Sequence, residues 1–133
     1  MKKKTTYDLR TERMDYIFDT HAHYDDEAFD ADREEVLTGL KKQGIGTVVN
    51  VGASIASTKT TLALAETHSF MYAAVGVHPN ETAELTDADM KWLESLAENP
   101  KVVAIGEIGL DYYWDEPERE IQKHWFSAQL AIA

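Results

Sequence analysis

The chain has 133 residues, of which 44% are hydrophobic, 28% are charged and none is cysteine, and this composition predicts one compact domain with its own core. A coiled coil, a collagen-like helix and a disordered chain are excluded, because apolar residues are plentiful and follow no heptad or Gly-X-Y repeat. The 24 acidic residues outnumber the 13 basic ones and give a formal net charge of −11, which excludes a broad basic surface for nucleic acid.

The N-terminal residues carry no pattern of a folded element. Residues 1–13 show neither strand alternation nor a helical apolar stripe, so we expect a loose extension, with the folded unit at residues 14–133. Lys2 to Lys4 lead into polar sequence rather than the apolar stretch of a signal peptide. No apolar run approaches the roughly 20 residues of a membrane helix. We therefore expect a cytoplasmic protein.

From residue 16 onward, short apolar segments alternate with longer amphipathic ones, which is typical of a parallel sheet with crossover helices. The predicted strands cover residues 16–19, 47–51, 71–77 and 102–108. The predicted helices lie within residues 32–43, within 57–67, from the N-cap Thr86 to 99–100, and from about 116–117 onward. The last three strands are almost continuously apolar, so we expect the sheet to be buried on both faces.

Local signals support three of these helices. Gly44 is placed to cap the first helix, and Thr86 with Asp89 three residues later forms a capping-box pattern. The last helix carries an apolar stripe at steps of four, three and four residues, formed by Ile121, Trp125, Ala128 and Ile132.

Four strand–helix units are half the complement of an eight-stranded βα barrel, whose usual length is about 250 residues. The sequence ends at residues 129–133 with no capping Gly or Asn and no basic last turn. We therefore expect an α/β fold that is the N-terminal half of a TIM barrel, in a chain that is a fragment. An open flavodoxin-like sheet is the competing architecture.

The most informative motif is DTHAH at residues 19–23, after the first predicted strand. Residues two apart in extended chain point to the same side, so His21 and His23 can hold one metal ion. Asp19 is placed to support a ligand or its neighbouring backbone. Two solvated loop histidines are the alternative, but the end of a barrel strand is where active sites are built. This placement favours metal ligands.

Glu107 is the one carboxylate in the apolar run 102–108. A buried charge is costly unless it is paired or binds a cation. This favours a metal-binding carboxylate over a structural glutamate that is paired with an arginine or hydrogen-bonded.

His78 follows the third predicted strand in the segment GVHP. Pro79 forces His78 into extended geometry, which would point the imidazole into the same rim. There it can bind a substrate phosphate or position a water. A plain turn histidine, with Pro79 and Asn80 making the turn, fits the spacing equally well.

Other polar and aromatic residues favour structural roles. The acidic run 25–27 resembles a metal cluster, but a solvated loop is the commoner meaning. Residues 112–114, Tyr-Tyr-Trp, can stack on bases, but more commonly pack their loop. We expect His68 to end a helix and His124 to be exposed.

Taken together, FDTHAHYDD at 18–26, GVHP at 76–79 and GEIGLDY at 106–112 resemble the TatD-type metal-dependent deoxyribonucleases, a branch of the amidohydrolase-like βα barrels. The resemblance covers residues 14–133 in order. H-x-H alone fits many amidohydrolases, whereas this combination is specific to the group.

The resemblance implies a hydrolase that cleaves phosphodiester bonds of DNA with a water activated by two divalent metal ions, of Mg, Mn or Zn. Carried over, His21 and His23 hold one ion and Glu107 bridges the two. The family's other ligands, two histidines from strands five and six and an aspartate from strand eight, belong to strands this sequence does not contain. Family members also often carry a histidine where Asn80 stands. We expect an incomplete, inactive site in this chain alone.

Two other functions stay open. A half barrel can associate with a second copy through its open sheet edges, or bind a partner, without catalysis. A related amidohydrolase would act on a small ester, lactone or amide. Many such enzymes bridge their ions with a modified lysine, which the fourth predicted strand does not supply.

Overall fold

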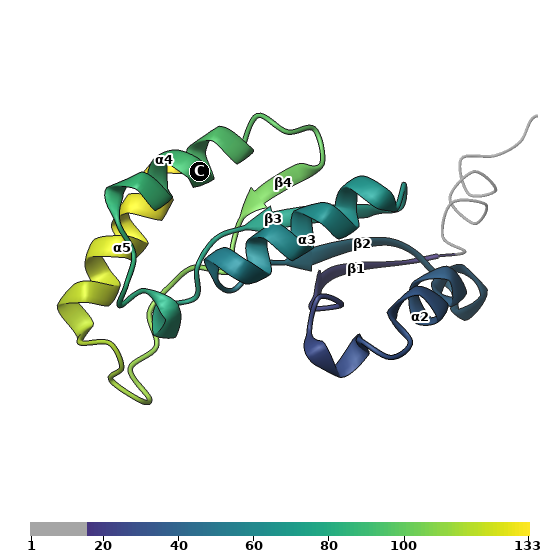
Figure 1. Cartoon of the computed structure of the whole chain (residues 1–133), viewed down its shortest axis with the longest axis horizontal. Helices are drawn as coiled ribbons and strands as arrows, with labels where there is room; N and C mark the ends of the chain where they lie inside the picture. The colour runs from purple at the N-terminus through teal and green to yellow at the C-terminus, as the bar shows by residue number, and fades with distance from the viewer. Residues whose placement is uncertain (1–15) are drawn as a thin grey trace, which may run out of the picture.

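The computed structural model describes residues 16–133, so the expected extension at 1–13 and the start of the folded unit at residue 14 lie outside the described residues. The described part contains one parallel sheet of strands β1 (Ile17–Ala22), β2 (Ile45–Val51), β3 (Met71–Val75) and β4 (Val102–Ile105). The strands follow one another across the sheet in chain order (Figure 1). A flavodoxin-like sheet would place β1 between β2 and β3, so that alternative is wrong.

Each strand is followed by helical structure (Figure 1). The α-helices are α2 (Arg33–Gly39), α3 (Ile55–Thr67), α4 (Asp87–Leu96) and α5 (Arg119–Ile132). Three short 3₁₀ helices are η1 (Glu27–Phe29), η2 (Leu40–Gln43) and η3 (Pro79–Glu81). Helix α3 packs on β2 and β3, and α5 lies beside α4. No helix of the described part is long and apolar enough to cross a membrane.

The capping signals operate as expected. Gly44 ends η2 in the left-handed conformation, with φ of 87°, which glycine adopts without steric cost. At α4, the Thr86 side chain accepts from the Asp89 amide and the Asp89 carboxylate accepts from the Thr86 amide. This reciprocal capping box satisfies two backbone donors at the start of the helix.

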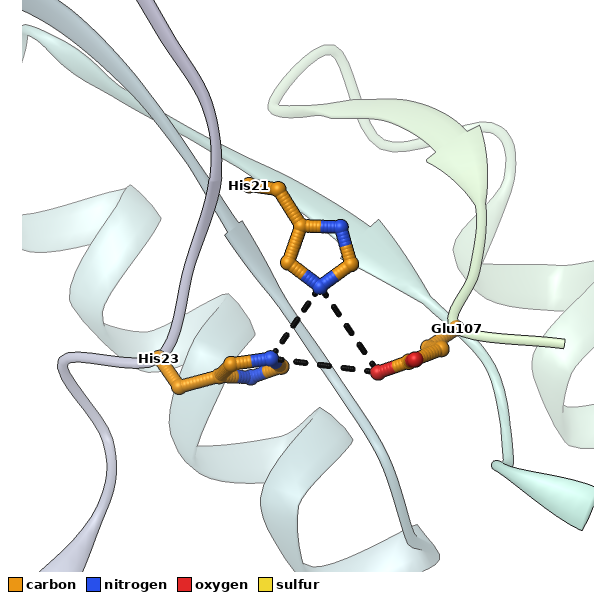
Figure 2. A group of neighbouring side chains, drawn as sticks. All are labelled: His21, His23 and Glu107. Atoms are coloured by element: carbon orange, nitrogen blue, oxygen red, sulfur yellow. Dashed lines mark hydrogen bonds and ion pairs between the residues drawn. The ribbon is translucent and has the colours of Figure 1, made fainter. Parts of the chain in front are cut away.

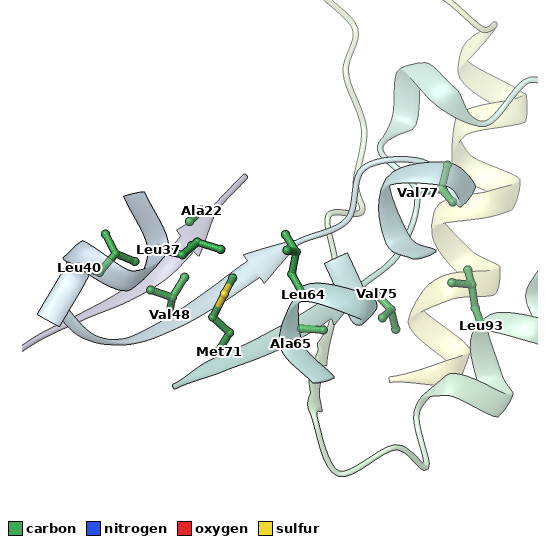
Figure 3. Packing of buried hydrophobic residues seen from close by; sticks show 11 residues of the cluster. Ala22, Leu37, Leu40, Val48, Leu64, Ala65, Met71, Val75, Val77 and Leu93 are labelled. Carbon is green, nitrogen blue, oxygen red and sulfur yellow. The ribbon is translucent and has the colours of Figure 1, made fainter. Parts of the chain in front are cut away.

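The main core lies between the sheet and its helices (Figure 3). Alternate residues of β2 and β3 face this core, because successive side chains of a strand point to opposite faces. The central members of the core are Leu37, Leu64, Ala65 and Leu93 from the helices and Val48, Met71, Ala73 and Val75 from the strands. The intervening residues Val49, Val51 and Ala74 form a smaller cluster.

The expectation of a sheet buried on both faces is wrong for its outer strands. Val103 of β4 is 54% exposed, and Phe18 of β1 is 58% exposed. Both strands lie at the edges of the four-stranded sheet, so each has a neighbour on one side only. β4 also ends at Ile105, and Glu107 therefore follows the strand instead of lying inside it.

The expected apolar stripe of α5 is only partly correct. Trp125 is buried, but Ile121 is 37% exposed, while Gln122 and Gln129 are buried. The Gln129 amide explains this arrangement, because it accepts from the Val77 amide at 2.8 Å and donates to the Val77 carbonyl at 3.1 Å. A buried glutamine is tolerated when its polar atoms are satisfied in this way.

Candidate metal centre

His21, His23 and Glu107 converge at one point (Figure 2). His21 lies in β1 and His23 directly after it, whereas Glu107 follows β4. His21 Nε2 and His23 Nε2 are 3.1 Å apart, and Glu107 Oε2 lies 3.7 Å and 3.8 Å from them. In a flat sheet, three strand spacings would separate β1 from β4 by about 14 Å. The side chains meet because the chain after β4 crosses the strand ends, where the Glu107 amide reaches the carbonyl of Gly52, directly after β2.

These three residues form the group in the described part that can hold a metal ion. The point equidistant from the two nitrogens and the carboxylate oxygen lies about 2.1 Å from each atom, which is the usual length of a zinc–nitrogen or zinc–oxygen bond. Imidazole and carboxylate are ligands for zinc and manganese as well. The spacing and chemistry of the three residues are therefore compatible with a divalent ion.

The His23 ring is oriented by the end of β2. Its Nδ1 lies 2.8 Å from the carbonyl oxygen of Val51. A carbonyl only accepts, so Nδ1 carries the proton, and in the neutral ring Nε2 carries the lone pair. Metal-binding histidines are commonly held in this way, with the second ring nitrogen donating to a backbone carbonyl. The lone pair of His23 thus faces His21 and Glu107.

Asp19 supports the backbone of His21. Its Oδ1 accepts from the His21 amide at 3.1 Å, in agreement with the supporting role expected from the sequence. Burial, together with the nearby negative charge of Asp19, raises the pKa of the Tyr24 phenol above its ordinary value. Tyr24 therefore stays a neutral phenol beside the histidine pair.

A backbone hydrogen bond fixes the position of Glu107. Its amide donates to the carbonyl of Gly52 at 2.7 Å, across the ends of β2 and β4. A Cβ on Gly76, at the end of β3, would lie 2.8 Å from the carbonyl carbon and oxygen of Gly106, so only glycine allows this close approach. Within the described residues, the ion-pair partners of Glu107 are histidines and include no arginine. The structural alternative of an arginine-paired glutamate finds no partner there.

His78 joins the group from the third strand. Its Nε2 lies 4.0 Å from Glu107 Oε1, and its Nδ1 accepts from the Asn80 amide at 3.1 Å. In the neutral ring the proton is therefore on Nε2. His78 presents an N–H donor to the site, whereas His23 presents a lone pair. A donor suits an anionic oxygen better than it suits a metal ion.

The acidic run 25–27 is not a metal cluster within the described residues. Asp26 accepts from the Ala28 amide at 2.8 Å and caps η1. Asp25 instead pairs with Asn50 and Ser57, neither of which the sequence reading singled out. Asn50 carried a usable signal, because it is the one amide side chain in the apolar run of β2.

The remaining candidates behave in different ways. His68 ends α3 with Nδ1 3.0 Å from the Leu64 carbonyl and Nε2 3.2 Å from Glu34, as expected for a structural histidine. His124 is exposed, also as expected. Tyr113 and Trp114 are 82% and 65% exposed, so the expectation that they pack their loop is wrong.

Comparison with known proteins identifies the family. Residues 18–133 match the model for TatD related DNases. The chain belongs to the TatD family. It is 41% identical over 117 residues to the uncharacterized metal-dependent hydrolase YabD of Bacillus subtilis, covering 88% of this chain and 46% of YabD. It is 35% identical over 118 residues to the 3'-5' ssDNA/RNA exonuclease TatD of Musicola paradisiaca, covering 88% of this chain and 45% of that protein.

A solved TatD-family structure shares the fold. The structure of YjjV, a TatD homologue from Escherichia coli, superposes with a TM-score of 0.80 at 34% identity and covers 90% of this chain and 47% of that chain. The chain spans about half the length of the curated relatives that it matches. Its four strand–helix units are the N-terminal half of a TIM-barrel hydrolase fold, and its family is one of metal-dependent hydrolases and nucleases.

Proposed function

We propose that this chain supplies the first half of a divalent-metal nuclease site that cleaves phosphodiester bonds of DNA. The observation behind the proposal is that one nitrogen each of His21 and His23 and one oxygen of Glu107 lie around a common point, at a distance typical of metal–ligand bonds. DNA is favoured as substrate because relatives of this family are named as nucleases of single-stranded DNA and RNA. With a net charge of −11, bound cations rather than surface lysines would meet the phosphate.

Each residue has a distinct role in this proposal. His21 and His23 hold one ion through Nε2. Glu107 directs Oε2 toward these imidazoles and Oε1 toward His78, so its second oxygen is available to a second ion. His78 donates from Nε2 to a phosphate oxygen. Two bound ions would supply an activated water and stabilise charge on the attacked phosphate.

The ligand set in this chain is incomplete for such a reaction. Three protein ligands can hold one zinc ion with an open position, but a pair of ions needs more. We therefore propose that the other half of the barrel completes the site, and that the 133-residue chain alone does not cleave DNA.

A chimera tests this proposal. Residues 1–133 would be joined to the C-terminal half of the Bacillus subtilis relative, and cleavage of single-stranded DNA would be measured with Mg²⁺, Mn²⁺ and Zn²⁺. We expect cleavage by the chimera, none by the 133-residue chain, and loss of cleavage with EDTA. Glu107→Gln in the chimera should reduce the rate by at least about a hundredfold, whereas Glu98→Gln, at an exposed site after α4, should leave it unchanged.

Three results would contradict the proposal. Cleavage that survives EDTA would exclude the metal site, and full activity of the Glu107→Gln chimera would exclude the bridging role. A folded chimera that hydrolyses small esters or lactones but not DNA would favour the related amidohydrolase activity instead. Circular dichroism of each variant establishes that it is folded.

The exposed edge strands favour a second candidate, a non-catalytic half barrel that associates with itself. Ile17 and Phe18 on β1 are 62% and 58% exposed, and Val103 on β4 is 54% exposed. Unpaired sheet edges with apolar side chains pair readily with other chains. Pairing of β4 of one copy with β1 of another would cover them.

A further inference from the structure

A polar cluster of Asp25, Asn50 and Ser57 binds the backbone directly after His23, at the Tyr24 amide. Asn50 is fully buried. Its Oδ1 accepts from the Tyr24 amide at 2.6 Å, and its Nδ2 donates to Asp25 Oδ1 at 2.8 Å. The second hydrogen of Nδ2 goes to Thr61 Oγ1, also at 2.8 Å. Both ends of the amide are used, so its orientation is fixed by the cluster.

The cluster joins three elements that build the site. Asp25 Oδ2 accepts from Ser57 Oγ at 2.6 Å, which connects the loop after β1 to the first turn of α3. Asn50 belongs to β2 and directly precedes Val51, whose carbonyl orients the His23 ring. The chain on both sides of this contact, at residues 24 and 25 and at residue 50, is therefore held by the cluster.

We propose that Asp25 is a positioning residue for the metal centre. Through Asn50 and Ser57 it fixes the backbone around His23, so that Nδ1 of His23 stays on the Val51 carbonyl and Nε2 stays directed at the ion. The inference rests on the metal site of the proposed function, but it is independent of the identity of the substrate.

The surroundings of Asp25 argue against the two simpler roles of an acidic loop residue. Each of its carboxylate oxygens accepts a short hydrogen bond from a neutral donor, and Asp25 is not in the group of described residues that could hold a metal ion. It is half-buried, unlike a solvated loop carboxylate. Its neighbour Asp26 is exposed, and the Asp26 carboxylate accepts from the Ala28 amide.

Asp25→Asn tests the proposal most directly, because it keeps the size of the side chain and replaces one of the two acceptor oxygens by an NH₂ donor. The new amide has one acceptor oxygen for two donors: if the oxygen stays on Asn50 Nδ2, the Ser57 hydroxyl hydrogen loses its acceptor, and if it faces Ser57, the NH₂ meets Asn50 Nδ2, which is also a donor. Changes to the groups that orient metal ligands commonly lower metal affinity by about 10–100-fold. Ser57→Ala removes one of the two donors and should have a smaller effect in the same direction.

The test uses the 133-residue chain and two measurements. Mn²⁺ affinity is measured by calorimetry, and the protonated nitrogen of His23 is identified in the metal-free chain by ¹⁵N NMR. We expect the wild type to show the Nδ1–H form. Asp25→Asn should mix the two tautomers and weaken Mn²⁺ binding by about tenfold or more.

Two aspartate-to-asparagine variants are the controls. Asp26→Asn changes the adjacent carboxylate, and Asp89→Asn removes the capping carboxylate of α4, far from the histidines. Both should keep the Nδ1–H form and the wild-type affinity, even where they lower the melting temperature.

The proposal would be overturned by an Asp25→Asn chain that keeps the His23 tautomer and the Mn²⁺ affinity, or by controls that weaken Mn²⁺ binding equally. If the wild type itself binds no Mn²⁺, the proposed metal site fails, and the tautomer of His23 in the metal-free variants still decides the role of Asp25. If Asp25→Asn does not fold, Ser57→Ala gives the same readout.

Discussion

His23 and His78 approach Glu107 from different strands, and their rings carry the proton on different nitrogens. His23 donates from Nδ1 to the Val51 carbonyl, whereas His78 accepts at Nδ1 from the Asn80 amide. Backbone groups thus decide which imidazole presents a lone pair and which presents a proton at the same rim. This difference fits the roles proposed for the two residues, His23 as a metal ligand and His78 as a substrate contact.

His78→Ala should therefore impair catalysis without impairing metal binding. In the chimera we expect Mn²⁺ affinity close to wild type and a loss of about 10–100-fold in kcat/KM for DNA, as when one donor to a developing charge is removed. His23→Ala should instead weaken Mn²⁺ binding itself. Calorimetry and steady-state kinetics on the two variants separate these outcomes, and a large loss of Mn²⁺ affinity in His78→Ala would make His78 a ligand.

The exposed rings of Tyr113 and Trp114 should stack on unpaired bases. Their ring centroids are 4.6 Å apart in an edge-to-face arrangement, on the segment that follows Glu107. Trp114→Ala should raise KM for single-stranded DNA by about tenfold, the lower part of the range for one stacked base. In the same chimera, Trp114→Ala should leave hydrolysis of a small phosphodiester without bases unchanged. Equal losses on both substrates would indicate a structural role for Trp114.

The residues proposed as metal ligands stand out in the sequence because their signals are local. The H-x-H spacing and the single carboxylate near an apolar strand are visible within a few residues. Asp25 could not be assigned in this way, since its partners Asn50 and Ser57 lie 25 and 32 residues away. Only the fold shows that a carboxylate in an acidic loop is satisfied by two neutral side chains.

At the scale of elements, the order of strands and helices and the caps of α2–η2 and α4 could be predicted, because hydrophobic period and capping residues act over one or two turns. The strand ends could not. The central strand β3 stops at Val75 instead of residue 77, and β4 stops at Ile105 instead of residue 108. Apolar residues such as Val77 stay buried beyond the end of a strand, so an apolar run does not mark where the strand ends. The buried glutamines of α5 were missed because their backbone partners lie outside the helix: Val77 for Gln129, and Asp111 and Pro117 for Gln122.

Gly76 controls how closely the ends of β3 and β4 approach. Gly76→Ala would place a Cβ 2.8 Å from the carbonyl of Gly106, next to Glu107. We expect a loss of about 1–3 kcal/mol in the free energy of unfolding, as for overpacking, together with weaker Mn²⁺ binding because Glu107 is displaced. Urea denaturation and calorimetry measure the two effects.

Gly39→Ala is the matched control for this change. Gly39 is the last residue of α2, its φ is −78° and nothing lies within 4 Å of a Cβ built there. Alanine should therefore stabilise the chain by about 0.5–1 kcal/mol and leave Mn²⁺ affinity unchanged. Unchanged metal binding in Gly76→Ala would show that the strand ends need not be this close to hold Glu107.

For the whole molecule, the segments that follow the strands produce the site. His21 belongs to one edge strand and Glu107 follows the other, yet their side chains come within 3.7 Å. The chain after β4 crosses the strand ends, and the Glu107 amide donates to the carbonyl of Gly52, directly after β2. The strand order that gives this arrangement also leaves β1 and β4 with a neighbour on one side only.

These open edges predict self-association of the isolated chain. Sedimentation velocity over a wide range of protein concentration should show a mass that rises with concentration, because exposed Phe18 and Val103 lie on unpaired strands. Val103→Lys places a charge on the β4 edge, a substitution that natural sheets use against edge pairing, and should shift association to higher concentration. Ala63→Lys adds the same charge at an exposed site of α3 and should leave the association unchanged.

The chimera should stay monomeric because its added strands pair with both edges. A 133-residue chain that is monomeric at every concentration would exclude the self-associating half barrel, and the completed barrel would be the one arrangement left to cover β1 and β4.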